Sequence, residues 1–226
     1  MIRELSGYTK EAFQELGRNA NPELTRVIVE DIASIWRLES SASLSPVAVL
    51  ISGFQGSGKS TTIDVLNKDL NFPVISADEI RYKLLERDIN PSEEEFKLQV
   101  AAVRNRLLSL VGYSNSSFIL DQKITVVRMH LIESILKKSS SLPYSIISIL
   151  LTAPMEVLRE RVAKRDEREG RYKGTLEELE DTVLRHGEFE ESRFTRVFHT
   201  NEQDTPSISE EIYAMISNFA GSSRIS

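Results

Sequence analysis

The residues with the clearest chemistry form a glycine-rich stretch that follows an apolar run. This stretch, GFQGSGKS from Gly53 to Ser60, fits the pattern G-x-x-x-x-G-K-S. Glycines let the backbone curl so that successive N–H groups form an anion nest. The helical stretch that follows adds the positive end of its dipole. The pattern therefore predicts a phosphate-binding loop.

Each residue of this loop has an expected task. Lys59 is placed to reach the β- and γ-phosphates of a nucleotide, and the hydroxyl of Ser60 to ligate Mg²⁺. The residues expected to contact the nucleotide are Gly53, Gln55, Gly56, Ser57, Gly58, Lys59, Ser60 and Thr61.

The loop alone does not specify a reaction, because GTPases, motor ATPases and kinases share it. A GTPase is disfavoured, since D-x-x-G occurs nowhere and the fragment Asn67-Lys68-Asp69 of the guanine-binding N-K-x-D motif is followed by Leu70. Short connections leave no room for the sensor modules of large ATPases. A kinase of small molecules or nucleic acids remains, and ATP is the expected donor.

The elements that must position these residues alternate along the chain. Five strand candidates precede or separate helical stretches: 47–52, 73–76, 118–121, 144–151 and 196–199. Most are nearly continuous apolar runs, which is typical of strands buried on both faces. The helices are expected to begin near Lys59, Ser76, Ser92, Ile124, Pro154, Thr175 and Pro206. This alternation predicts an α/β fold, a parallel sheet flanked by helices on both faces.

Capping boxes of the form S/T-x-x-E mark three of these helix starts. They are Ser76…Glu79, Ser92…Glu95 and Thr175…Glu178.

A serine-rich stretch at residues 40–45 divides the chain into a helical extension, 1–45, and a kinase domain, 46–226. The extension is expected to hold two helices. The second starts at Asn21-Pro22, with Asn as the cap and Pro in the first helical position. Its apolar face carries Leu24, Val27, Ile28, Ile32 and Ile35. The face either packs on the main body or binds a partner protein.

Composition excludes several classes of protein. The 226 residues are 40% hydrophobic and 27% charged, carry a net charge of −6 and include no cysteine. The missing cysteines exclude disulfides, thiolate zinc sites, iron–sulfur clusters and a cysteine nucleophile. No apolar run is long enough for a membrane helix, and the charged N-terminus is not that of a signal peptide. We therefore expect a cytoplasmic protein without a membrane partner.

Further polar residues follow the other strands. Asp78-Glu79-Ile80-Arg81 comes after the second strand and Asp121 ends the third, while an arginine-rich stretch follows the fourth. Together with the glycine-rich loop, these resemble the P-loop kinases of the zeta-toxin and polynucleotide-kinase-like group, over residues 47–216. The resemblance implies a five-stranded parallel sheet of order 2-3-1-4-5, with an ATP- and Mg²⁺-dependent kinase site at its carboxyl edge.

The resemblance also implies roles for these residues. Asp78 is similar to the carboxylate that deprotonates the acceptor hydroxyl, and Arg81 to the positively charged residue that holds the acceptor. Asp121 is similar to the acid that acts through Mg²⁺, so the metal residues are Ser60 and Asp121. An acid at the position of Asp78 also favours the dipole of its helix without any catalytic role. The arginine-rich stretch is similar to the lid that closes over the γ-phosphate. At least one of three arginines that are spaced to share one helical face is expected to contact that phosphate: Arg161, Arg165 and Arg168.

Two questions stay open at this level. The acceptor is either a small metabolite or nucleotide sugar, as in zeta-toxin kinases, or a polynucleotide 5′-hydroxyl. The acidic net charge favours the small acceptor over nucleic acid. A hypothesis of another class is an ATP-binding regulatory module that engages a protein partner, and the resemblance implies a helical, antitoxin-like one.

Overall fold

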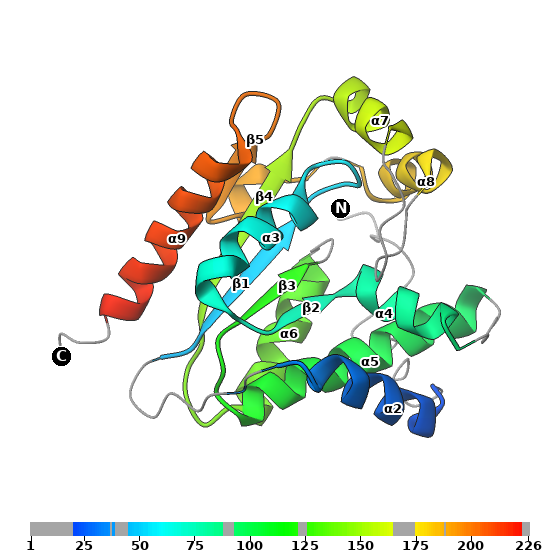
Figure 1. Cartoon of the computed structure of the whole chain (residues 1–226), viewed down its shortest axis with the longest axis vertical. Helices are drawn as coiled ribbons and strands as arrows, with labels where there is room; N and C mark the ends of the chain where they lie inside the picture. Colours follow the sequence, from blue (N-terminus) through cyan, green and yellow to red (C-terminus); the bar gives the residue numbers. More distant parts are fainter. Residues whose placement is uncertain are drawn as a thin grey trace, which may run out of the picture.

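A five-stranded parallel sheet forms the centre of the molecule (Figure 1). The structure is a computed structural model that describes residues 20–36, 38, 45–87, 93–121, 126–164, 175–187 and 189–222. The strands are β1 (Val47–Ser52), β2 (Val74–Ser76), β3 (Phe118–Asp121), β4 (Ser145–Thr152) and β5 (Arg196–His199). Their order, β2-β3-β1-β4-β5, confirms the expected fold class.

The helices alternate with these strands along the chain. They are α2 (Pro22–Ala33), α3 (Lys59–Leu70), α4 (Ala77–Leu85), α5 (Glu93–Tyr113), α6 (Val126–Ser139), α7 (Met155–Ala163), α8 (Leu176–His186) and α9 (Thr205–Ser222), with a short 3₁₀ helix at Glu191–Arg193. Each expected helix start lies within about two residues of the observed one. Turn and capping signals in the sequence therefore predict where these helices begin.

The three expected capping boxes have different outcomes. Thr175 and Glu178 form the box at the start of α8 as predicted. The box at Ser76 is wrong: the side chain of Ser76 caps no helix N–H and its Oγ donates to Asp121 Oδ2 instead, at 3.3 Å. Ser92 lies outside the described residues.

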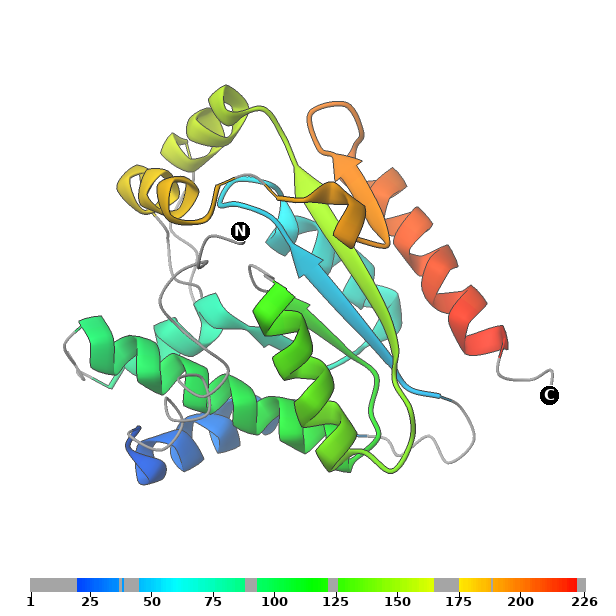
Figure 2. The same ribbon diagram turned by 180° about the vertical axis from the view of Figure 1, so that it is seen from behind.

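Both faces of the sheet are covered by helices, as β1 shows residue by residue. Ala48 and Leu50 belong to the hydrophobic cluster that includes residues of α2, α4, α5 and α6. Val47, Val49 and Ile51 belong to the cluster on the other face, with residues of α3 and α9. Figure 2 shows α5 and α6 on the face that lies behind the sheet in Figure 1. This double burial explains why the strands are continuous apolar runs.

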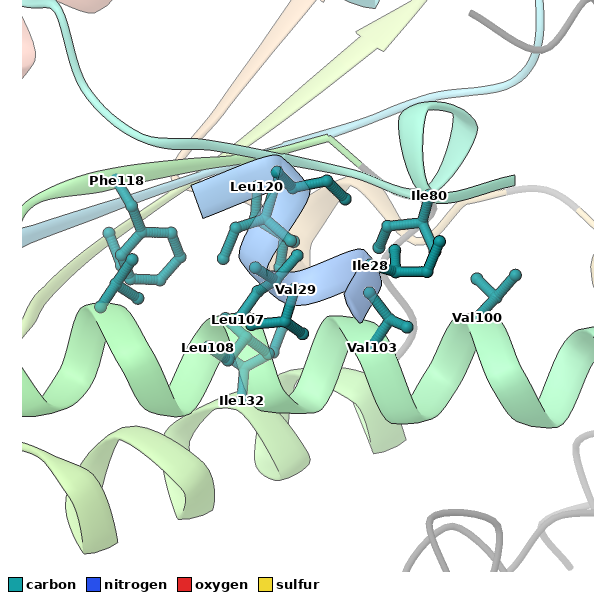
Figure 3. Packing of buried hydrophobic residues seen from close by; sticks show 14 of the residues in the cluster. Ile28, Val29, Ile80, Val100, Val103, Leu107, Leu108, Phe118, Leu120 and Ile132 are labelled. Carbon is teal, nitrogen blue, oxygen red and sulfur yellow. The ribbon is translucent and has the colours of Figure 1, made fainter. Parts of the chain in front are cut away.

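Helix α2 packs against α5, and its buried residues join the main core (Figure 3). Ile28, Val29 and Ile32 are buried there. Gln99 of α5 is also buried and binds the backbone of Asn21, the cap residue of α2: the Asn21 N–H donates to Gln99 Oε1 at 3.0 Å. The second expected helix of the extension thus packs on the main body.

The prediction that Ile35 belongs to the apolar face of α2 is wrong. Ile35 lies past the C-cap of the helix and is 77% exposed. The first expected helix of the extension lies outside the described residues, and the division at residue 45 stays a prediction. Within the described part of the chain, no helix is long and apolar enough to cross a bilayer.

Candidate active site

The glycine-rich loop joins the carboxyl end of β1 to the start of α3, and three of its glycines are required by the backbone. Gly53, Gly56 and Gly58 have φ of +150°, +81° and +88°, a region that side chains disfavour. A Cβ on Gly53 would lie 2.3 Å from the carbonyl oxygen of Leu151, and one on Gly56 2.8 Å from that of Leu158. Gly58 meets no atom within 4 Å, so its requirement is conformational alone.

Lys59 lies over this loop, where its ammonium group can bind an anion. Its Nζ donates to the carbonyl oxygens of Gly53 at 3.0 Å and Phe54 at 3.1 Å. Among the described residues, Ser57 Oγ and Gln55 Oε1 are buried without a hydrogen-bond partner. The left-handed backbone, the lysine and the start of α3 together fit the phosphates of a nucleotide.

Asp121 ends β3 beside the loop. It pairs in register with Ile51 of β1 and with Ser76 of β2, and only 6% of it is exposed. Its carboxylate accepts the hydrogen bond from Ser76 Oγ. The acid is therefore held at the carboxyl edge of the sheet, next to the strand that leads into the phosphate loop.

The donor set at this edge fits Mg²⁺ held jointly with a nucleotide. Within the described ranges, no three His, Asp or Glu side chains gather as a metal cage. Mg²⁺ commonly binds through one or two protein oxygens and the phosphates of its substrate. Ser60, at the start of α3, and Asp121 are the residues present that fit this mode.

Asp78 and Arg81 lie one turn apart at the start of α4, which directly follows β2. Arg81 Nη1 donates to Asp78 Oδ1 at 2.8 Å, and the two side chains are 39% and 31% exposed. The strand order makes β2 the neighbour of β3, so this ion pair and Asp121 follow adjacent strands. The crevice outside the carboxyl ends of such strands is where open α/β sheets bind ligands.

The expected lid arginines are only partly described. Helix α7 carries Arg161, whereas Arg165 and Arg168 lie outside the described residues, so their shared face stays a prediction. Arg161 donates to the carbonyl oxygen of Gly56 at 3.3 Å and to both oxygens of Thr200 at 2.7 Å. Arg159 points elsewhere and pairs with Glu180 of α8 at 3.3 Å.

Two features around the loop could not be predicted from the sequence. Phe54 is 9% exposed and packs in a small cluster with Leu158 and Val162 of α7. Its ring lies 4.7 Å from that of Phe189. Thr200, which follows β5, is the other feature, since it anchors Arg161. Neither has a local signal, because the partners are far apart in sequence.

Solved structures with this fold include several kinases. One, provisionally described as a kinase from Chloroflexus aurantiacus J-10-fl, is 18% identical, with 74% of this chain and 97% of that chain covered and a TM-score of 0.54. A gluconokinase from Sinorhizobium meliloti 1021 is 16% identical, covering 79% and 95% of the two chains, with a TM-score of 0.52. The PezAT toxin–antitoxin system of Streptococcus pneumoniae is 18% identical, covering 71% and 64%, with a TM-score of 0.47.

The first two of these likenesses show the fold, which is that of P-loop kinases. No curated protein matches this sequence. A family model described as an AAA domain matches residues 49–185, from β1 to the last turn of α8, and so includes the phosphate loop, Asp78, Asp121 and Arg161. The chain belongs to this AAA domain family.

Proposed function

We propose that this protein is a kinase that transfers the γ-phosphoryl group of ATP to a hydroxyl of a small metabolite or nucleotide sugar. The observation that carries the proposal is the placement of three groups at the carboxyl edge of adjacent strands. The phosphate loop follows β1, Asp121 ends β3, and the pair of Asp78 and Arg81 follows β2. A donor site and an acceptor site side by side are what phosphoryl transfer needs.

In this mechanism the loop holds the donor. Its N–H groups and the N-terminus of α3 cradle the phosphates. Lys59 leaves the carbonyl oxygens of Gly53 and Phe54 and neutralises charge that develops on the transferred group. Mg²⁺, held by Ser60 and Asp121 with the nucleotide, would supply further charge neutralisation.

The acceptor side supplies the proton chemistry. The carboxylate of Asp78 takes the proton of the acceptor hydroxyl as the new O–P bond forms and the bond to the leaving ADP breaks. Arg81 orients that carboxylate through their ion pair and holds the acceptor with its positive charge. The protein thus contributes positioning and electrostatic stabilisation, with no covalent intermediate.

The net charge of −6 supports a small acceptor over a polynucleotide. The experiment is a panel of acceptors with γ-labelled ATP: sugars, UDP-amino sugars and oligonucleotides with 5′-hydroxyl ends. Transfer to a sugar or nucleotide sugar is expected, with Lys59→Ala as the inactive control. Transfer to the oligonucleotides alone would replace this acceptor class by polynucleotide ends. ATP binding without transfer to any acceptor would favour the regulatory module.

A helical, antitoxin-like partner is a weaker part of the proposal. The apolar residues of α2 do not supply its binding face, because Ile28, Val29 and Ile32 are already buried against α5. Co-purification of a small helical protein from the native source, with loss of ATP binding in the complex, is the result that would support it.

A further inference from the structure

The peptide unit between Gly56 and Ser57, in the middle of the phosphate loop, is held from both sides. Its carbonyl oxygen accepts a hydrogen bond from Arg161 Nη1 at 3.3 Å. Its N–H, on Ser57, donates to the carbonyl oxygen of Phe54 at 3.2 Å. A peptide unit held at both ends cannot rotate without breaking one of these bonds.

Arg161 is itself anchored, so it can transmit this constraint. Nη1 donates to Thr200 Oγ1 and Nη2 to the Thr200 carbonyl oxygen, both at 2.7 Å. Thr200 is tied in turn to the end of β4, because its N–H donates to the carbonyl oxygen of Thr152 at 2.8 Å. The guanidinium therefore links α7, the turn after β5 and the phosphate loop.

Apolar packing supports the same arrangement. Gly56 lies so close to α7 that an added Cβ would lie 2.8 Å from the Leu158 carbonyl oxygen and 3.2 Å from a methyl group of Val162. Phe54, two residues earlier, packs on these same two residues. One side of the loop thus packs against α7. This packing sets the distance between the backbone of α7 and the Gly56 carbonyl oxygen that Arg161 binds.

We propose that Arg161 is a positioning residue for phosphate binding. It keeps the Gly56 carbonyl turned toward α7, so that the loop presents N–H groups rather than a carbonyl oxygen to the anion. This inference rests on the proposed function and differs from the γ-phosphate contact that the arginine-rich sequence predicts. The planar fork of arginine can serve Gly56 and Thr200 together, whereas the single ammonium of lysine cannot reproduce that geometry.

The test measures binding of ATP, ADP and inorganic tripolyphosphate to the full chain by calorimetry. Arg161→Gln should weaken all three by a similar factor, about 10-fold or more, as for loss of a hydrogen bond to a charged group. Arg161→Lys should restore little. Thr200→Val removes one anchor of the guanidinium and should give a smaller loss with the same pattern. Arg159→Gln is the matched control on the same helix, and it should bind as the wild type does.

The other outcomes overturn the inference in distinct ways. A loss confined to ATP would mean a γ-phosphate contact, and a loss for both nucleotides but not for tripolyphosphate would mean a contact with the nucleoside. A lower melting temperature with unchanged binding of all three would mean a purely structural role. If the wild-type chain bound none of the three, the proposed function itself would fall, and the inference with it.

Discussion

Replacing Asp78 with Asn tests the acceptor side of the proposed mechanism most directly. The substitution keeps the shape of the side chain and removes only its charge. Asp78 lies in the first turn of α4 and accepts a hydrogen bond from Arg81 at 2.8 Å. The amide oxygen of Asn can still accept that bond, so the local geometry should persist while the base is lost.

The expected cost in stability is small. A partly exposed pair spaced i,i+3 contributes about 0.2–0.5 kcal/mol, and an acid at a helix N-terminus about 0.3–1 kcal/mol. The sum is about 1 kcal/mol, which lowers the melting temperature by roughly 2–4 °C in a chain of this size. Ser76 makes no side-chain cap on α4, so no capping box is disrupted.

The expected cost in activity is much larger. Loss of a positioned general base lowers kcat by about 10² to 10⁴, equivalent to about 3–5 kcal/mol in the activation barrier. ATP affinity should stay nearly unchanged, because the phosphate loop and Lys59 follow a different strand. The stability effect cannot mimic this loss, since folded proteins are typically stable by about 5–15 kcal/mol.

The assay combines steady-state kinetics, on an acceptor that the panel identifies, with thermal unfolding. Glu79→Gln is the matched control, because Glu79 is the neighbouring acid in the same first turn. We expect it to give a similar shift in melting temperature and near-normal kcat. If Asp78→Asn also kept near-normal kcat, Asp78 would serve only the helix dipole and Asp121 would be the next carboxylate to test.

Five other variants test the loop and the core. Lys59→Ala should lower kcat by about 10² to 10³ with an unchanged melting temperature, and a variant that kept more than about a tenth of the activity would contradict the role given to the loop. Gly58→Ala should lower the free energy of unfolding by about 1–2 kcal/mol through backbone strain. Gly56→Ala should lower it further, because the added Cβ would also lie 2.8 Å from the Leu158 carbonyl oxygen. Equal shifts in the urea midpoint of the two variants would refute this ranking. Ile28→Ala should cost about 2–5 kcal/mol in urea unfolding, because its side chain is fully buried, and a loss below 1 kcal/mol would mean that α2 is peripheral to the core. Burial raises the pKa of Tyr144, whose hydroxyl donates to the carbonyl oxygens of Val111 and Ser116. Since the unfolded phenol ionises near pH 10, the protonated hydroxyl stabilises the fold fully below pH 10, and this contribution is lost as the pH rises above 10. Tyr144→Phe should therefore flatten the alkaline fall in the free energy of unfolding.

The sequence alone determined the elements and the donor loop. Runs such as VAVLIS predict strands buried on both faces, and β1 has the predicted bounds, Val47–Ser52. The loop motif predicts its own conformation, since left-handed φ at Gly56 and Gly58 depends on the absence of a side chain at each residue. These features are local, so a short stretch of sequence contains all the information that they need. The strand order came from the family resemblance rather than from the pattern.

Only the tertiary structure decided which partner each polar side chain takes. Ser76 has a local partner in its own helix, three residues away, yet it donates to Asp121 because register pairing of β2 with β3 brings that carboxylate beside it. The resemblance implies that Arg161 is a lid arginine, yet it binds Gly56, 105 residues away, and Thr200. Local capping and side-chain pairs of this kind contribute only a few tenths to about 1 kcal/mol each. The tertiary fold decides the partner, because it determines which groups lie within hydrogen-bonding distance in a desolvated site. No local sequence pattern encodes those distances.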